Sequence, residues 1–128
     1  MDPYERLRAD YREWPELLED LAAMEYPGGE PLEGTAFILG MGGSGHGART
    51  ISRCLRERRV RASNDFRVRE RLGRGDLVIA VSYSGETAET INAFLEAISQ
   101  GAEGVAVAGG GRLLSVAEGA GARSLRVR

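Results

Sequence analysis

The first hydrophobic positions of the chain recur every three or four residues between Pro3 and Met24. This spacing predicts an amphipathic helix. Its apolar stripe consists of Leu7, Tyr11, Trp14, Leu17, Leu18 and Leu21. The Gly- and Pro-rich segment Pro27–Pro31 then interrupts the pattern. We therefore expect an N-terminal helical arm over residues 1–30, which either covers the sheet or serves as a dimerisation contact.

From Thr35 onward, short apolar runs alternate with amphipathic segments. The apolar runs predict strands at Thr35–Leu39, Val60–Ala62, Asp76–Val81, Gly104–Ala108 and Arg123–Val127. The amphipathic segments predict helices at Ser44–Arg58, Glu86–Ser99 and Gly111–Gly119. Such alternation is typical of a parallel sheet with helices on both faces. We predict a single α/β core over residues 35–128, a three-layer sandwich around about five parallel strands.

The predicted helices also indicate which side chains face the sheet. The inward positions are Ala48, Ile51, Cys54 and Leu55 in the helix after the first strand, and Ala88, Ile91, Phe94, Leu95 and Ile98 in the next. By this pattern the only cysteine, Cys54, belongs to the core. A single cysteine also excludes an internal disulfide and suggests a reducing compartment.

The composition of the chain argues against several classes of function. The chain has 128 residues, of which 42% are hydrophobic and 28% charged, as in an ordinary globular domain. No apolar run approaches the ~18 residues of a membrane helix, and the acidic N-terminus argues against a signal peptide. A net charge of −2 gives no reason to expect a nucleic-acid partner. One His and one Cys argue against zinc, and the lack of Lys excludes a Schiff base. We expect a cytoplasmic protein with no cofactor, no metal and no membrane contact.

The first candidate loop, Gly40–Gly45, follows a strand and opens a helix. Glycines let the backbone approach a ligand closely, and the free N–H groups at a helix start favour an anion. Ser44 adds a hydroxyl that can cap the helix or contact a phosphate oxygen. The loop also matches GxGxxG, and Asp65 lies twenty residues beyond Gly45. A dinucleotide-binding domain therefore remains an alternative on this motif alone.

The second candidate loop, Ser82–Thr87, lies between the strongest strand and an amphipathic helix. Three hydroxyls, those of Ser82, Ser84 and Thr87, surround one glycine. Such a group can donate several hydrogen bonds to one phosphate. Helix capping would need only one hydroxyl. The cluster at a strand's carboxyl end therefore favours an anion site, which a dinucleotide fold does not require.

Together these motifs, Gly40–Gly45 and Val81–Thr90, resemble the N-terminal half of bifunctional phosphoglucose/phosphomannose isomerases, which are sugar isomerase (SIS) enzymes with a flavodoxin-like fold. The resemblance implies that Gly42, Gly43 and Ser44 contact sugar or phosphate and that Ser82, Ser84 and Thr87 hold the phosphate. Asp65, Tyr83 and Gly85 are possible sugar contacts. The family often has Asn where Glu86 stands, and a hydroxyl where Ala108 stands.

These isomerases contain two SIS domains, and their catalytic residues lie beyond the part this sequence matches. Catalytic residues are therefore unassigned. His46, the only histidine, and the carboxylates Glu86 and Glu89 are nearby, but helix-start roles explain them better. We predict a hexose 6-phosphate-binding domain that takes part in aldose–ketose isomerisation when a second domain completes it. The expected partners are a phosphosugar ligand and either a second SIS domain or a second copy of the chain. The alternatives are a non-catalytic phosphosugar sensor and the dinucleotide-binding domain.

Overall fold

The computed structural model describes residues 2–23, 32–54, 59–63 and 70–127. Contacts divide the chain into two compact units, Met1–Glu30 and Pro31–Arg128. The described residues of the first unit form a helix, and those of the second contain the sheet. Because no described helix combines the length and apolarity of a bilayer span, a membrane-crossing helix is not found in these residues.

In the first unit the structure describes the helix α1, Pro3–Ala23. It matches the predicted helix to within one residue. Pro15 lies inside it, and the Tyr11 and Trp14 rings lie one turn apart with centroids separated by 4.8 Å. The apolar stripe predicted from the spacing is therefore present on a continuous helix.

The second unit is built on a five-stranded parallel sheet in the order β2-β1-β3-β4-β5. The strands are β1 Ala36–Leu39, β2 Val60–Ser63, β3 Leu77–Val81, β4 Glu103–Ala108 and β5 Arg123–Arg126. All five predicted strands are present, with ends shifted by a residue at most. Sequence alternation thus predicted both the number of strands and their parallel pairing.

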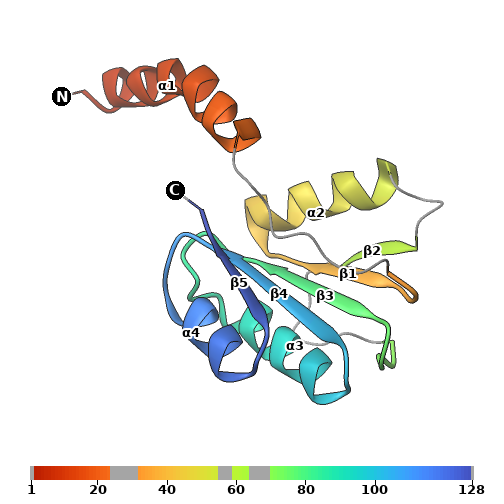
Figure 1. Cartoon of the computed structure of the whole chain (residues 1–128). Helices are drawn as coiled ribbons and strands as arrows, with labels where there is room; N and C mark the ends of the chain where they lie inside the picture. The colour runs from red at the N-terminus through yellow and green to blue at the C-terminus, as the bar shows by residue number, and fades with distance from the viewer. Residues whose placement is uncertain (1, 24–31, 55–58, 64–69, 128) are drawn as a thin grey trace. The chain divides into compact units, whose positions relative to one another are not determined.

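Helices cover both faces of the sheet, as Figure 1 shows. The helix α2, Gly42–Cys54, lies on one face, while α3, Ala88–Ser99, and α4, Arg112–Gly119, lie on the other. The core lies between the sheet and the α3–α4 layer. Its largest fully buried side chains are Phe94, Leu39, Leu113, Val78 and Thr90. This is the predicted three-layer α/β architecture.

The α2 face of the sheet is less fully covered. Because α2 lies over β1 and β2, it leaves the outward-facing residues of β3 and β4 on that side only half-buried. These are Leu77, Ile79, Val81, Val105 and Val107. On the opposite face, alternate residues such as Val78 and Ala106 are fully buried.

Two expectations about the helices are wrong. Cys54 and Ile51 are exposed rather than part of the core, since only Gly45 and Ala48 of α2 are buried. The pattern correctly located an amphipathic helix, but this single helix does not bury its whole apolar face. In α3 the prediction holds for Ile91 and Phe94, whereas Ala88 and Leu95 are exposed. Leu55 lies outside the described residues.

Candidate phosphate site

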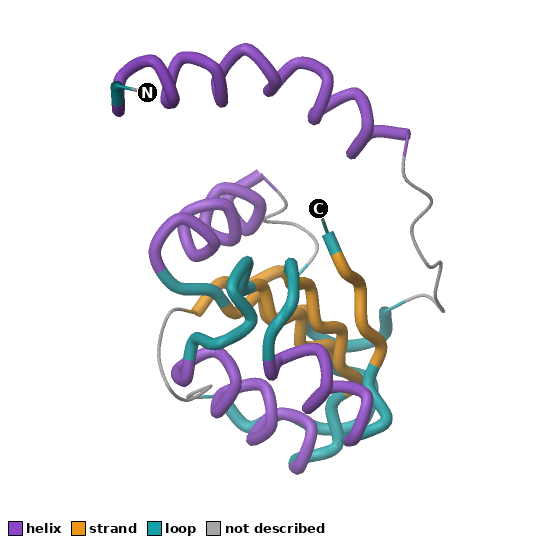
Figure 2. The backbone as a smooth tube through the Cα atoms, turned by 90° about the vertical axis from the view of Figure 1, so that its left-hand side faces the viewer, coloured by secondary structure: helices purple, strands orange, loops and turns teal. Residues whose placement is uncertain are grey.

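The sheet order reverses direction between β1 and β3. From β1 the chain turns to α2 on one face, whereas from β3 it turns to α3 on the other. In open α/β sheets, ligands bind at such a switch point, outside the carboxyl ends of the strands. The loops after β1, β3 and β4 lie along this edge (Figures 1 and 2). Both predicted loops therefore follow adjacent strands, at the end of the sheet where a ligand is expected.

The loop after β1 is shorter than predicted, because α2 begins at Gly42 rather than at Ser44. The Gly45 N–H donates to the Met41 carbonyl at 3.2 Å, which closes the first helical turn. Gly42 and Gly43 are exposed, and a side chain on either would meet no atom within 4 Å. The first N–H groups of a helix have no partner within it. The first N–H groups of α2 therefore have no acceptor within the helix, and Ser44 is half-buried beside them.

In the loop after β3, the three hydroxyls have different surroundings. Ser82 is 3% exposed, and its Oγ accepts the Gly85 N–H at 3.2 Å. The Ser82 and Thr87 hydroxyl oxygens are 3.0 Å apart. Ser84 is exposed, and its Oγ accepts the Glu86 N–H at 3.2 Å. The buried Ser82 side chain therefore stabilises the turn, while the Ser84 and Thr87 side chains lie closer to solvent.

Thr87 is the N-cap residue of α3, but its side chain makes no capping hydrogen bond. Its hydroxyl is paired with Ser82 instead. The N–H groups of Ala88 and Glu89 at the start of α3 are consequently left without a side-chain cap. An uncapped helix start has the electrostatics of an anion site, because the helix dipole places positive potential there. The helix-capping alternative for this cluster is thus disfavoured by the geometry.

The loop after β4 packs directly against the loop after β3. The Gly109 N–H donates to the Tyr83 carbonyl at 2.8 Å, and the Leu113 N–H donates to the Gly85 carbonyl at 2.9 Å. Gly85 has a φ of +70° and Gly111 a φ of +78°, which favour glycine. A side chain on Gly85 would collide with the Gly110 carbonyl. The two backbones therefore cross where only glycines fit.

Glu86 links the same two loops through hydrogen bonds. Its Oε1 accepts the Arg112 backbone N–H at 2.9 Å, and its Oε2 accepts the Arg112 Nε–H at 2.6 Å. Hydrogen bonds from the Arg112 side chain and backbone lower the pKa of the Glu86 carboxyl below its ordinary value of 4.5. The ionised carboxylate is therefore held at the start of α4, where the Arg112 guanidinium compensates its charge.

The remaining predicted residues lie as follows. Tyr83 is 71% exposed, and its ring lies close to Gly109. His46 is exposed on α2. Asp65, a possible sugar contact and the acid of the dinucleotide alternative, lies outside the described residues. Arg112 was not singled out from the sequence; its position directly after the third glycine-rich loop was the available signal.

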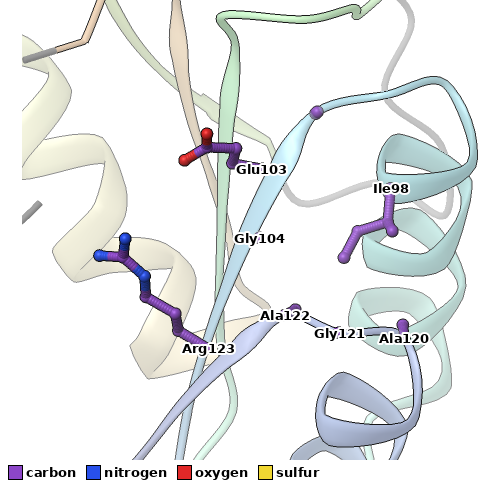
Figure 3. A pocket seen from close by; sticks show the side chains of 8 residues that line it. Ile98, Glu103, Gly104, Ala120, Gly121, Ala122 and Arg123 are labelled. Carbon is purple, nitrogen blue, oxygen red and sulfur yellow. The ribbon is translucent and has the colours of Figure 1, made fainter. Parts of the chain in front are cut away.

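A separate pocket of about 370 Å³ lies at the other edge of the sheet, where β4 and β5 begin (Figure 3). Its lining is Ile98, Ala102, Glu103, Gly104 and Ala120–Arg123. In Figure 3 the charged side chains of Glu103 and Arg123 point to the opposite side of the sheet from Ile98. The pocket is thus lined mainly by backbone and small apolar groups and does not share the chemistry of the loops.

Comparison with known proteins identifies the family that this chain matches. The SIS domain family matches residues 33–112, more than half of the chain. The bifunctional phosphoglucose/phosphomannose isomerase of Thermoplasma acidophilum is 43% identical over 76 residues, which cover 59% of this chain and 24% of that protein. The enzyme of the same name from Aquifex aeolicus is 32% identical over 110 residues, covering 83% of this chain and 32% of that protein.

A third relative is named for a different activity. The D-glucosamine-6-phosphate 4-epimerase of Sulfolobus acidocaldarius is 31% identical over 112 residues, covering 87% of this chain and 36% of that protein. A crystal structure of a putative phosphosugar isomerase from Clostridium difficile has the same fold, with a TM-score of 0.50 and 20% identity over 82% of this chain and 30% of that one. The chain spans about a quarter to a third of the length of its curated relatives.

Proposed function

Because this chain belongs to the SIS domain family, we propose that the loops after β1 and β3 bind the phosphate group of a hexose 6-phosphate. The single observation that carries the proposal is the uncapped start of α3. Its N-cap hydroxyl is held by Ser82, so its amide donors remain available at the switch point. The glycine-rich start of α2, on the neighbouring strand, supplies a second set of donors.

The hydroxyl pair gives Thr87 a defined role. The Ser82 oxygen already accepts the Gly85 N–H, and one hydrogen is shared between Ser82 and Thr87. If Ser82 donates that hydrogen, the Thr87 hydroxyl is free to donate to an anion. We assign direct phosphate contact to Thr87 and Ser84, and a supporting role to Ser82. Binding by neutral donors in this way needs no lysine, and the chain contains none.

The remaining contacts follow from the same placement. Gly42, Gly43 and Ser44 approach the sugar or its phosphate from the α2 side, where no side chain stands in front of the two glycines. Tyr83 and Gly85 belong to the other loop, and an exposed tyrosine ring there suits a sugar face. Asp65, after β2, is kept as a possible ligand of sugar hydroxyls. Together these groups would cover one phosphorylated sugar.

We further propose that the domain acts as the ligand-binding half of an aldose–ketose isomerase, completed by a second SIS domain or a second copy. The relatives named above act on phosphorylated sugars according to their names, but those names describe both isomerases and an epimerase. The shared feature is the phosphorylated sugar, which supports binding more directly than any one reaction. Isomerisation also needs a base, and the Glu86 carboxylate is occupied by Arg112.

The binding proposal is tested by calorimetry with fructose 6-phosphate, fructose and NAD. We expect heat of binding with the phosphorylated sugar only. Thr87→Val should weaken binding about 10- to 150-fold, because a hydrogen bond to a charged group contributes about 1.5–3 kcal/mol. Thr50→Val, the same change at an exposed site on α2, is the matched control and should bind as the parent does. Binding of NAD without response to the sugar would overturn the proposal.

Catalysis is tested separately. The chain alone should not interconvert fructose 6-phosphate and glucose 6-phosphate at ordinary enzymic rates. Turnover at such rates would show that this domain carries its own base. A non-catalytic sensor is the alternative: it would bind the same ligand, yet no second SIS domain would be encoded beside it or restore turnover when added.

A further inference from the structure

The loop after β3 is anchored at three positions, Tyr83, Gly85 and Glu86, to the loop after β4 and the first turn of α4. The Tyr83 and Gly85 carbonyl oxygens accept backbone N–H groups at 2.8 Å and 2.9 Å, and Glu86 uses its side chain. The hydroxyls assigned above to phosphate contact, those of Ser84 and Thr87, lie between and directly after these anchors. The positions of the two hydroxyls therefore depend on contacts with a segment that follows a different strand.

Of the three anchors, Glu86 is connected most directly to both hydroxyls. Its backbone N–H donates to the Ser84 Oγ at 3.2 Å, so the Ser84 hydroxyl keeps its own hydrogen for another acceptor. The next residue in the chain is Thr87, the N-cap of α3. The Glu86 carboxylate is held at both oxygens by Arg112, at 2.9 Å and 2.6 Å. One side chain, attached at two atoms, thus fixes the backbone between the two hydroxyls.

The ion pair between Glu86 and Arg112 is too exposed to contribute much to the stability of the fold. The Arg112 and Glu86 side chains are 69% and 49% exposed, and ion pairs in contact with solvent typically contribute little. The pair does provide a defined geometry, because a carboxylate that is bonded through both oxygens has one preferred orientation. An acid beside an anion site is also unfavourable by charge alone. Glu86 is therefore explained better by the orientation it imposes than by stability or charge.

We propose that Glu86 and Arg112 are positioning residues of the phosphate site, which hold the Ser84 and Thr87 hydroxyls in place for the ligand. This inference rests on the proposed function, and it makes the start of α4 a supporting element of the site. It also fixes the sign of a substitution. If Glu86 acted only through its charge, neutralising it would strengthen the binding of an anion. If Glu86 acts as a positioning residue, the same change weakens binding.

The sign is tested by calorimetry of the full chain with fructose 6-phosphate. Glu86→Gln keeps one acceptor oxygen but places an NH₂ group where the second oxygen accepted, so one hydrogen bond to Arg112 is lost. We expect binding about 3- to 10-fold weaker, the effect of one ordinary hydrogen bond. Glu70→Gln is the matched control. Glu70 pairs with Arg61 at 3.2 Å, its side chain is 48% exposed, and its variant should bind as the parent does.

A double-mutant cycle tests whether the two residues act as a pair. Arg112→Gln removes the anchor and also leaves the Glu86 charge uncompensated, so it should weaken binding more than Glu86→Gln does. The double variant should bind as Glu86→Gln alone does, and therefore more tightly than Arg112→Gln. Circular dichroism verifies that each variant is folded.

The outcomes separate this inference from the function on which it rests. A parent chain that does not bind fructose 6-phosphate would overturn the proposed function and the positioning role together. If the parent binds and Glu86→Gln binds equally well or more tightly, only the positioning role is wrong. Additive losses in the cycle would show that Arg112 acts on the ligand without Glu86, which would also overturn the pair.

Discussion

The Glu86 carboxylate holds both the backbone N–H and the guanidinium of Arg112, a residue 26 positions further along the chain. The two residues bring together loops that follow different strands. The Glu86 carboxylate is therefore directed at the start of α4 and at the Arg112 guanidinium. Its negative charge is compensated there, which reduces its repulsion of an anion at the start of α3. A residue that looks unfavourable for phosphate binding in the sequence is thus accounted for by its partner.

The pairing of Glu86 with Arg112 should be lost in acid. The hydrogen bonds lower the folded-state pKa of Glu86 below 4.5, so the bonded carboxylate is favoured above that pH and is lost as the pH falls through the lowered value. We expect the amide proton of Arg112 to titrate in NMR spectra with a midpoint below 4.5. Glu86→Gln should remove this titration. A midpoint at or above 4.5 in the parent would contradict the geometry.

Gly85→Ala should destabilise the chain by at least about 2 kcal/mol, because the added carbon meets the Gly110 carbonyl in a left-handed backbone conformation. Gly47→Ala is the matched control. Gly47 lies inside α2 with nothing within 4 Å of its added carbon, so alanine there should stabilise by up to about 1 kcal/mol. Urea denaturation measures both. Equal effects of the two substitutions would argue against the crossing of the loops.

Asp76 links the segments that precede β1 and β3, at the amino ends of the strands and therefore at the opposite end of the sheet from the candidate site. Its Oδ1 accepts the Thr35 N–H at 2.8 Å and its Oδ2 accepts the Gly73 N–H at 3.0 Å. Asp76→Ala leaves both donors unpaired and should cost about 1–3 kcal/mol of unfolding free energy. Because this edge lies away from the switch point, the affinity for fructose 6-phosphate should not change. A loss of affinity in a folded variant would show that the two edges are coupled.

Thr90 provides a test of a buried polar group. Its hydroxyl is buried in α3 with no hydrogen-bond partner among the described residues. An unpaired buried hydroxyl is costly, so Thr90→Val should raise the unfolding free energy by about 1 kcal/mol. Thermal denaturation of the two proteins provides the measurement. Destabilisation by valine would mean that the hydroxyl has a partner in the folded protein.

The sequence predicted the sheet well because its strands are continuous apolar runs and its glycine loops mark their ends. It placed the start of α2 two residues late, because Gly42 and Gly43 are poor helix formers by sequence, whereas the first turn of the helix closes at Met41 through the Gly45 N–H. It placed Cys54 in the core because an apolar stripe does not reveal how much of a helix the rest of the fold covers.

The candidate site was predictable only in part. The hydroxyls of the second loop and the glycines of the first were visible as motifs, and the strand order brings them to one edge. The contact between Glu86 and Arg112 was not visible, because it depends on β3 pairing with β4 and on the backbone crossing at Gly85. Nor did the motif distinguish Ser82, which is buried within the turn, from the more accessible Ser84.

The reversal of direction between β1 and β3 has a mechanical consequence. The helices that follow these strands shield opposite sides of the sheet, yet their amino termini lie at the same end of the sheet, after adjacent strands. A dianion seated there would cross-link the two layers through one point. Separating β1 from β3, or lifting either helix, would then break contacts with that single group. Occupancy should therefore slow amide exchange on both sides of the sheet, including at residues that never approach the ligand.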